Sequence, residues 1–299
     1  FWYESSKMMQ SLMNDQKKRR EDKIKELQAF IQRFSSNKSK AKQATSRRKL
    51  LDQLTIEQMP ASSRRYPWVC FTPEREAGKD ILQVSNLNYT QDGVQLLKDV
   101  SFIVTKGQKI ALVGSNEQAQ TALFRILAEE IKPDSGSFKW GLSTSRSYFP
   151  ADNSAFFASD LNLIDWMRQY SKDQTETYIR GFLGRMLFSG DAVLKPVNVL
   201  SGGEKVRCML SRMMLFGSNV LILDQPTNHL DLESIQAFNN SLINFKGNVL
   251  MSSHDHEFVN TVANRIIELT PNGMVDRYME YDDYITDEVV ARRLEALWA

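Results

Sequence analysis

The sequence predicts an α/β domain preceded by an antiparallel α-helical hairpin. From Asp80 onward, short apolar runs alternate with segments of helical period, which is the pattern of a parallel sheet covered by helices. Residues 1–34 contain neither Gly nor Pro and carry apolar residues at helical spacing. A polar turn at 35–39 and a second helical segment at 40–58 follow, and two helices joined by so short a turn pack as a hairpin.

Three consecutive parts are therefore expected. Residues 1–79 are predicted to form the hairpin and a connector, 80–285 the α/β domain, and 286–299 a C-terminal helical tail. Within the connector, residues 67–69 are expected to dock on the domain that follows. The expected strands are 81–87, 100–104, 109–113, 146–149, 220–224 and 248–252; the expected helices are 122–130, 232–244 and 256–263, with a mostly helical section at 161–187 and a hairpin around 271–273.

Composition is that of an ordinary soluble globular protein, with 42% hydrophobic and 25% charged residues in 299. No apolar run approaches the roughly 18 residues needed to cross a bilayer, so a fused transporter is excluded but a separate membrane partner is not.

The two cysteines, Cys70 and Cys208, provide neither a disulfide framework nor a zinc set, which indicates a reducing cytosol. The start at Phe1, without a signal-peptide pattern, suggests a fragment of a longer chain.

The charge is divided unevenly along the chain. Residues 1–66 hold 16 Lys/Arg against 7 Asp/Glu, a net charge of +9, whereas residues 67–299 hold 22 against 29, a net charge of −7. A basic helical region is either a solvated face or a contact for a polyanion, because Lys and Arg that meet phosphates release counterions. The charge distribution alone is consistent with both interpretations.

A Ser-Gly-Gly turn opens a helix at residues 200–205. Free backbone N–H groups and the positive end of the helix converge there, so Ser201, Gly202, Gly203 and Glu204 form a candidate anion site. By itself such a tripeptide is merely a turn.

A buried apolar strand at 220–224 ends in Asp224. In parallel α/β sheets this is the usual place for a metal-binding carboxylate, and the hydroxyl of Thr121 is the matching second ligand for Mg²⁺.

A third motif lies at 114–121, between a short apolar strand and a helix, which is the setting of a phosphate-binding P-loop. The candidate nucleotide-binding residues are Gly114, Ser115, Asn116, Gln120, Thr121 and Ala122.

That loop departs from the P-loop pattern in its second half. Ala119 stands where a second Gly is expected, so a strained positive φ is expected there. Gln120 replaces the Lys that neutralises phosphates, and Glu117 adds a carboxylate beside them. The sequence therefore predicts a damaged P-loop.

Together these motifs resemble an ATP-binding cassette domain of the P-loop NTPase fold. Residues 200–205 resemble its signature motif, 220–224 its Walker B strand and 226–231 its D-loop, which ends in Asp231. The sequences of the signature motif and of the D-loop resemble those of the ABC-F family. Residues 34–48 are similar to the inter-domain linker of its YbiT-like branch. The chain would then be the linker and second nucleotide-binding domain.

The resemblance implies further site residues. Gln225 stands where the family has a Glu that polarises the attacking water, and an amide cannot accept a proton. His254 matches the switch histidine that contacts the γ-phosphate, and Tyr89 is the candidate adenine-stacking ring. His256 is expected to be incidental.

The function implied is that of the C-terminal half of a cytoplasmic, ribosome-associated translation ATPase. Its cofactors would be ATP and Mg²⁺, bound between paired cassettes, one of them a missing N-terminal cassette or a homodimer partner. The basic hairpin would reach ribosomal RNA and tRNA, with no membrane involved, and Gln120 and Gln225 would impair hydrolysis at the chain's own site. Two alternatives stay open: a non-catalytic nucleotide-binding or regulatory module, and the ATPase subunit of a membrane transporter.

Overall fold

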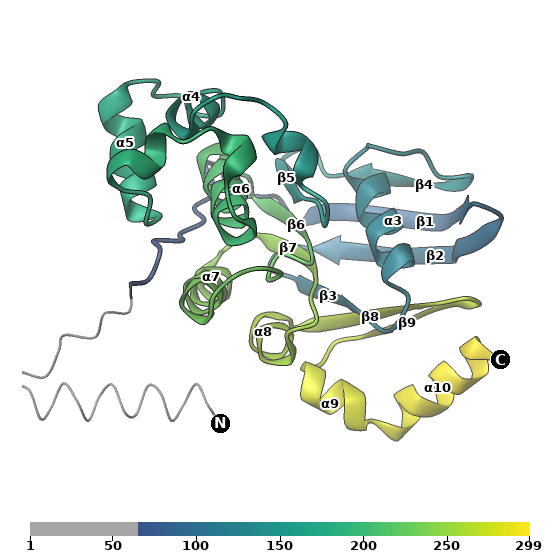
Figure 1. The fold of residues 1–299 in the computed structure, drawn as a ribbon. Helices are drawn as coiled ribbons and strands as arrows, with labels where there is room; N and C mark the ends of the chain where they lie inside the picture. Colours follow the sequence, from purple (N-terminus) through teal and green to yellow (C-terminus); the bar gives the residue numbers. More distant parts are fainter. Residues whose placement is uncertain (1–64) are drawn as a thin grey trace, which may run out of the picture. The chain divides into compact units, whose positions relative to one another are not determined.

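Two β-sheets form the frame of residues 65–299, the part of the chain that the computed structural model describes (Figure 1). The helices predicted within residues 1–58 lie outside the described residues. Residues 65–299 group as one unit that begins at Arg65. The smaller sheet is antiparallel in the order β2-β1-β4, and its strands are β1 (Asp80–Gln91), β2 (Val94–Thr105) and β4 (Ser135–Trp140).

Strands β1 and β2 form a hairpin longer than the sequence predicts. Asp92 and Gly93 have φ of 52° and 80°, the positive angles that a tight two-residue hairpin turn requires. Because the turn takes only these two residues, pairing continues to Gln91↔Val94. The predicted strands at 81–87 and 100–104 are therefore the inner parts of two longer strands.

The larger sheet has the order β5-β6-β7-β3-β8-β9, and all of its pairs are parallel except β8–β9. Every residue of β6 and β7 is buried, as expected for strands covered on both faces. The carboxyl ends of the parallel strands meet at one edge, where the predicted motifs lie. The six strands are β3 (Lys109–Val113), β5 (Arg146–Phe149), β6 (Val220–Asp224), β7 (Asn248–Ser252), β8 (Arg265–Thr270) and β9 (Gly273–Arg277).

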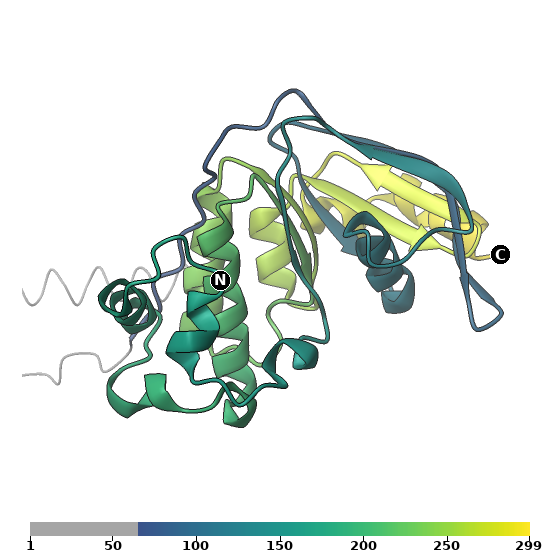
Figure 2. The same cartoon turned by 90° about the horizontal axis from the view of Figure 1, so that it is seen from above.

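Helices cover the larger sheet on both faces. One apolar cluster joins β6 and β7 to α6, α7 and α8, and a second lies between the two sheets and α3. Figures 1 and 2 show α6–α8 on one side and α3 with the smaller sheet on the other. The helices are α3 (Glu117–Leu127), α4 (Leu163–Arg168), α5 (Glu176–Arg185), α6 (Gly202–Phe216), α7 (Leu232–Asn244), α8 (His256–Val262), α9 (Tyr281–Thr286) and α10 (Glu288–Trp298).

The bounds of α3 differ from the prediction. Helix α3 begins at Glu117 rather than at residue 122, because Asn116 caps it, and it ends at Leu127 rather than at residue 130. Helix α9 was not predicted and ends where the predicted tail begins, whereas α10 lies within that tail and is capped by the side chain of Asp287.

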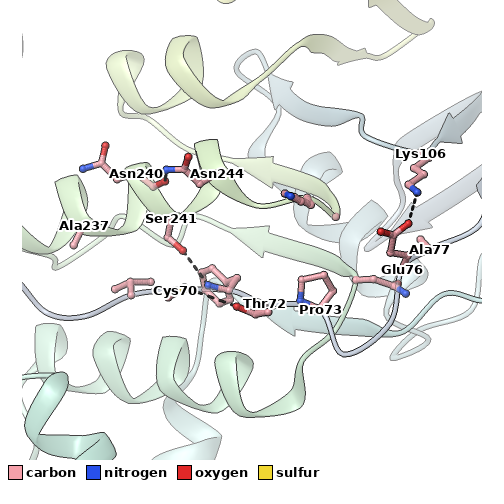
Figure 3. A pocket seen from close by; sticks show the side chains of 15 residues that line it. Cys70, Thr72, Pro73, Glu76, Ala77, Lys106, Ala237, Asn240, Ser241 and Asn244 are labelled. Atoms are coloured by element: carbon pink, nitrogen blue, oxygen red, sulfur yellow. Dashed lines mark hydrogen bonds and ion pairs between the residues drawn. The ribbon is translucent and has the colours of Figure 1, made fainter.

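The connector docks on the α/β domain, as its apolar residues predict. Trp68 N–H donates to the carbonyl of Arg185 in α5, and Phe71 N–H donates to Ser241 Oγ in α7. Val69 and Phe71 are buried in the cluster under α6 and α7. A cavity of about 720 Å³ lies between the connector and α7 (Figure 3).

Candidate nucleotide site

A cavity of about 360 Å³, here called the P-loop cavity, lies at the carboxyl edge of the larger sheet. Its lining comes from the ends of β3, β6 and β7 and from α3, α8 and α9. The lining residues are Leu112, Val113, Gly114, Gln120, Gln225, Ser253, His254, His256 and Tyr281.

The P-loop is shortened because the helix starts early. Asn116 Oδ1 accepts a hydrogen bond from Ala119 N–H at 3.1 Å, and Gln120 N–H donates to the carbonyl of Asn116 at 3.2 Å. These two N–H groups are thus used inside the helix. Ala119 is helical and has no positive φ, so the strain predicted there is wrong.

Gln120 is folded back onto its own loop. Its side chain is almost fully buried, and Nε2 donates to the carbonyls of Val113 at 3.1 Å and Gly114 at 3.0 Å. Both amide hydrogens are therefore engaged. The group in the position of the usual lysine supplies no positive charge and has no donor left for a phosphate.

The surroundings of the cavity are rich in carboxylates. Among residues 65–299, those that line the cavity include no Lys or Arg. Glu117 Oε1 lies 3.4 Å from Nε2 of His254, so His254 faces the loop's own carboxylate. Glu268 of β8 lies directly against Gly114. This distribution opposes a triphosphate, since like charges at short range repel.

Asp224 and Thr121 meet at the end of β6. Ser252 Oγ donates to Asp224 Oδ1 at 2.9 Å, whereas the buried Oδ2 has no hydrogen-bond partner among residues 65–299. Burial raises the pKa of the Asp224 carboxyl, and the nearby hydroxyls of Thr121 and Ser252 oppose the rise. A buried, unsatisfied carboxylate oxygen beside a hydroxyl fits Mg²⁺, which takes few protein ligands and keeps the rest for water or phosphate. The donor set thus fits the metal.

Gln225 follows Asp224 with a φ of 50°, which turns its side chain toward the cavity. Its N–H donates to the carbonyl of Ser252 at 3.2 Å. Its Oε1 is buried and lacks a partner among the described residues. A water molecule at this position could donate a hydrogen bond to Gln225 Oε1, but the amide could not accept its proton.

The signature turn and the D-loop pack against each other. Ser201 and Glu204 form a capping box at the start of α6: Ser201 N–H donates to Glu204 Oε2 at 2.8 Å, and Glu204 N–H donates to Ser201 Oγ. A Cβ on Gly203 would lie 2.8 Å from the carbonyl of His229, and one on Gly202 3.1 Å from the His229 side chain. Gly203 is therefore needed for this approach, because an added Cβ would meet backbone, whereas a Cβ on Gly202 would require a small shift of the His229 side chain.

Asp231 ends the D-loop and caps α7. Its Oδ1 accepts from Ser234 N–H at 2.8 Å. Burial opposes ionisation, but the hydrogen bonds from Ser234 hold the pKa of Asp231 below its ordinary value.

Of the predicted nucleotide-binding residues, Gly114 and Gln120 line the cavity, whereas Tyr89, Ser115, Asn116, Thr121 and Ala122 do not. Tyr89 is on β1, with its ring partly buried against the cluster between the sheets. Ser115 is exposed and Ala122 is buried in the helix.

Helix α9 forms part of the wall of the P-loop cavity, which the sequence analysis did not predict. Tyr281 lines the cavity and its ring lies 5.1 Å from that of His256, which also lines it. Tyr284 donates its hydroxyl to Glu268 Oε2 at 3.0 Å. The spacing Tyr281-x-x-Tyr284 places both rings on one helical face, and this was the available signal.

Comparisons with known proteins identify sequence relatives of this chain. Residues 97–228 match the sequence model of the ABC transporter family, and residues 1–68 match a second model of the same description. YkpA of Bacillus subtilis (strain 168), an uncharacterized ABC transporter ATP-binding protein, is 60% identical over 301 residues, which cover 100% of this chain and 56% of YkpA. YbiT of Escherichia coli O157:H7, a probable ATP-binding protein, is 39% identical over 263 residues, which cover 88% of this chain and 50% of YbiT.

A solved dimer of an ATP-binding cassette, in a post-hydrolysis state with ADP and Pi, has the same fold. Its TM-score is 0.55 at 15% identity, over 67% of this chain and 99% of that one. The chain belongs to the ATP-binding cassette proteins. Within them it is an ABC-F protein whose relatives fit the YbiT-like branch. It spans about half the length of the curated relatives it matches.

None of the helices within residues 65–299 is long and apolar enough to cross a bilayer.

Proposed function

We propose that this chain supplies the linker and second cassette of a cytoplasmic ABC-F ATPase that binds ATP and Mg²⁺ between paired cassettes. In this proposal the chain's own P-loop site hydrolyses ATP slowly or not at all, whereas its signature turn completes the site of the other cassette. The observation that carries it is the Gln120 amide, which donates to Val113 and Gly114 of its own loop.

The signature half of the site supports the asymmetry. Ser201 and Glu204 satisfy the start of α6 by mutual capping, and Gly202 and Gly203 let the turn pack closely against His229 of the D-loop. The capping box takes the N–H groups of Ser201 and Glu204, whereas the N–H groups of Gly202 and Gly203 stand in the first helical turn, where such groups have no intrahelical partner and can bind phosphate beside the positive helix end. The P-loop also uses two N–H groups at the start of its helix, and it differs from the signature turn in having lost its cation.

Asp224 and Thr121 would hold Mg²⁺, with Ser252 fixing the carboxylate by its hydroxyl. When bound, Mg²⁺ neutralises charge on the phosphates. The chain's own residues then position rather than react. His254 is paired with Glu117, and Gln225 orients a water without taking its proton.

ATP turnover and nucleotide affinity of the 299-residue chain test this proposal. The unmodified chain is expected to show no turnover above buffer. Gln120→Lys should raise ATP affinity by about a hundredfold, the scale of one charged donor aimed at a phosphate. Gln118→Lys adds the same charge at an exposed neighbouring position and should change affinity less than about threefold.

Gln225→Glu on top of Gln120→Lys should then permit measurable turnover. Brisk hydrolysis by the unmodified chain would contradict the proposal. If Gln120→Lys restored no binding, the loop would be no nucleotide site at all.

The proposed partner of the basic region at residues 1–66 is ribosomal RNA and tRNA, because its net charge of +9 suits a polyanion. ATP-dependent co-sedimentation of the intact protein with ribosomes is the expected result. Pelleting with membranes instead would favour a transporter subunit. Binding of ATP without turnover by the intact protein would favour a regulatory module.

A further inference from the structure

Helix α9 is attached to the wall of the P-loop cavity by its own set of polar contacts. His256 Nε2 lies 3.0 Å from Asp282 Oδ1, and Asn260 Nδ2 donates to Asp282 Oδ2 at 2.9 Å. Asp282 N–H in turn donates to Asn260 Oδ1 at 3.0 Å. These contacts fix α9 against α8, so that Tyr281 lines the cavity beside His256.

From this position α9 reaches the strand that neighbours the P-loop. Tyr284 is buried, with 3% of its surface exposed, and its hydroxyl donates to Glu268 Oε2 at 3.0 Å. Glu268 is the register partner of Val113, the last residue before the P-loop. The hydroxyl therefore holds the Glu268 carboxylate at the start of the loop.

The carboxylate and Gly114 are in tight contact. A Cβ on Gly114 would lie 2.7 Å from both Cγ and Oε1 of Glu268. Gly114 also has a φ of 94°, so no other residue fits this position without strain.

The negative charge of Glu268 is not neutralised by an ion pair within residues 65–299, where its hydrogen-bond partner is the neutral Tyr284 hydroxyl. Burial disfavours the ionised form and raises the pKa of Glu268, and the Tyr284 hydroxyl opposes this by donating to the carboxylate. The hydroxyl thus favours the ionised form against the effect of burial, and it fixes the carboxyl group beside a loop whose ordinary ligand is an anion.

We propose that Glu268 and Tyr284 act as a positioning pair that sets how strongly the P-loop holds phosphate. The Tyr284 hydroxyl keeps the carboxylate against Gly114, and the carboxylate repels the phosphate groups of a nucleotide. Repulsion grows with the charge of the ligand, so the pair discriminates against nucleoside triphosphates more than against nucleoside monophosphates. The inference rests on the proposed function, since it requires residues 114–121 to be a nucleotide site.

The test is made in the Gln120→Lys background of the 299-residue chain, where nucleotide binding is expected to be measurable. Glu268→Gln keeps the size of the side chain and removes its charge. We expect ATP affinity to rise roughly three- to tenfold and AMP affinity to change less than about twofold. Glu257→Gln removes the charge of an exposed glutamate on α8 and should leave both affinities unchanged.

Tyr284→Phe tests the second member of the pair. It should change ATP affinity in the Glu268 protein and have no effect once Glu268→Gln is present, because the hydroxyl acts through the carboxylate. Thermal unfolding of each variant confirms that the affinities refer to folded protein.

The outcomes separate the two proposals. Suppose that the Gln120→Lys chain binds ATP. If Glu268→Gln then leaves ATP affinity unchanged, or raises ATP and AMP affinity equally, the proposed positioning pair is contradicted, whereas the proposed nucleotide site is supported. If the Gln120→Lys chain binds no ATP, the proposed nucleotide site fails and the pair fails with it.

Discussion

Gln120 differs from the lysine usual at its position both in charge and in where its side chain ends. A lysine ammonium reaches out to phosphate as a point charge, whereas the shorter amide meets the carbonyls of Val113 and Gly114. Those carbonyls give the buried amide the partners it needs, since an unpaired buried donor is costly. One substitution thus both removes a ligand for phosphate and closes the loop on itself.

Asp231 is a residue whose contribution to stability depends on pH. The hydrogen bonds from Ser234 hold its pKa below the ordinary value of 3.8, although burial opposes this. Its charge therefore stabilises the fold at pH values above 3.8, and this stabilisation is lost as the pH falls through the folded-state pKa.

Asp231→Ala should lower the free energy of unfolding by about 1 kcal/mol at pH 7, the usual effect of losing an N-cap. Asp231→Asn keeps an acceptor for Ser234 and should cost less. Urea unfolding from pH 7 to pH 3 should show the difference between wild type and Asp231→Asn shrinking toward the acid end. A difference that grows on acidification would contradict this assignment.

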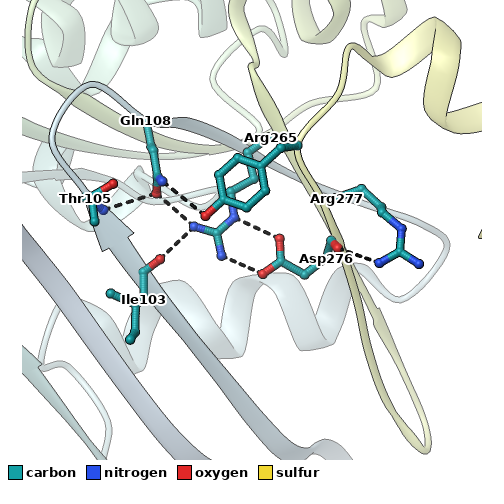
Figure 4. Close-up of polar contacts among 7 residues, drawn as sticks. Ile103, Thr105, Gln108, Arg265, Asp276 and Arg277 are labelled. Carbon is teal, nitrogen blue, oxygen red and sulfur yellow. Dashed lines mark hydrogen bonds and ion pairs between the residues drawn. The ribbon is translucent and has the colours of Figure 1, made fainter.

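At the scale of elements, a buried arginine joins three strands. Arg265 Nε donates to Asp276 Oδ1 at 2.8 Å, which links β8 to β9, and Nη1 donates to the carbonyl of Ile103 in β2 at 2.7 Å (Figure 4). Nη1 also donates to Gln108 Oε1 at 2.8 Å. The guanidinium is thereby satisfied in a setting where only 3% of its side chain is exposed.

Asp276→Asn should cost roughly 3 kcal/mol of unfolding free energy, because it leaves the buried Arg265 charge without its counter-ion. The matched control is Glu129→Gln, which breaks the exposed pair with Arg146 and should cost less than about 1 kcal/mol. Denaturant unfolding of the two variants measures both. Equal losses would show that burial does not decide the strength of these pairs.

The contact between signature turn and D-loop gives a second prediction about elements. A methyl group on Gly203 would meet the His229 carbonyl at 2.8 Å, so Gly203→Ala must displace backbone. We expect it to lower ATP turnover of the intact two-cassette protein by about tenfold or more.

Gly181→Ala is the control, because no atom lies within 4 Å of its added Cβ in α5. It should leave turnover unchanged and stabilise the fold by about 0.5 to 1 kcal/mol. Normal turnover in Gly203→Ala would mean that this close approach is unimportant for the reaction.

The sequence predicts some elements of the structure correctly and others not, and each outcome has a physical reason. The strands at 109–113, 146–149 and 248–252 match the predicted ranges, since buried apolar runs bounded by polar residues have few other solutions. The start of α3 was predicted wrongly because the P-loop pattern was given more weight than the Asn116 cap and Glu117, both typical of a helix N-terminus. The Glu268–Tyr284 contact depends on how α9 packs, which a local pattern does not encode.

For the whole molecule, we propose that the signature turn keeps its phosphate-binding features, whereas the P-loop has lost its cation. Ser201 caps α6 and its turn packs against the D-loop, whereas Gln120, Glu117 and Glu268 surround the P-loop with an amide and two carboxylates. In a pair of cassettes each nucleotide site combines one P-loop with the opposite signature. The proposal is therefore that the two nucleotide sites of the intact protein are unequal.

The most direct test compares Ser201→Ala with Gln225→Ala in the intact two-cassette protein, by steady-state ATP turnover, with thermal unfolding to confirm that both variants are folded. The account predicts that Ser201→Ala lowers kcat by about tenfold or more, because it damages the active site completed by the other cassette. Gln225→Ala should leave kcat within about twofold, because its own site contributes little turnover. Loss of turnover in Gln225→Ala with normal turnover in Ser201→Ala would contradict the account.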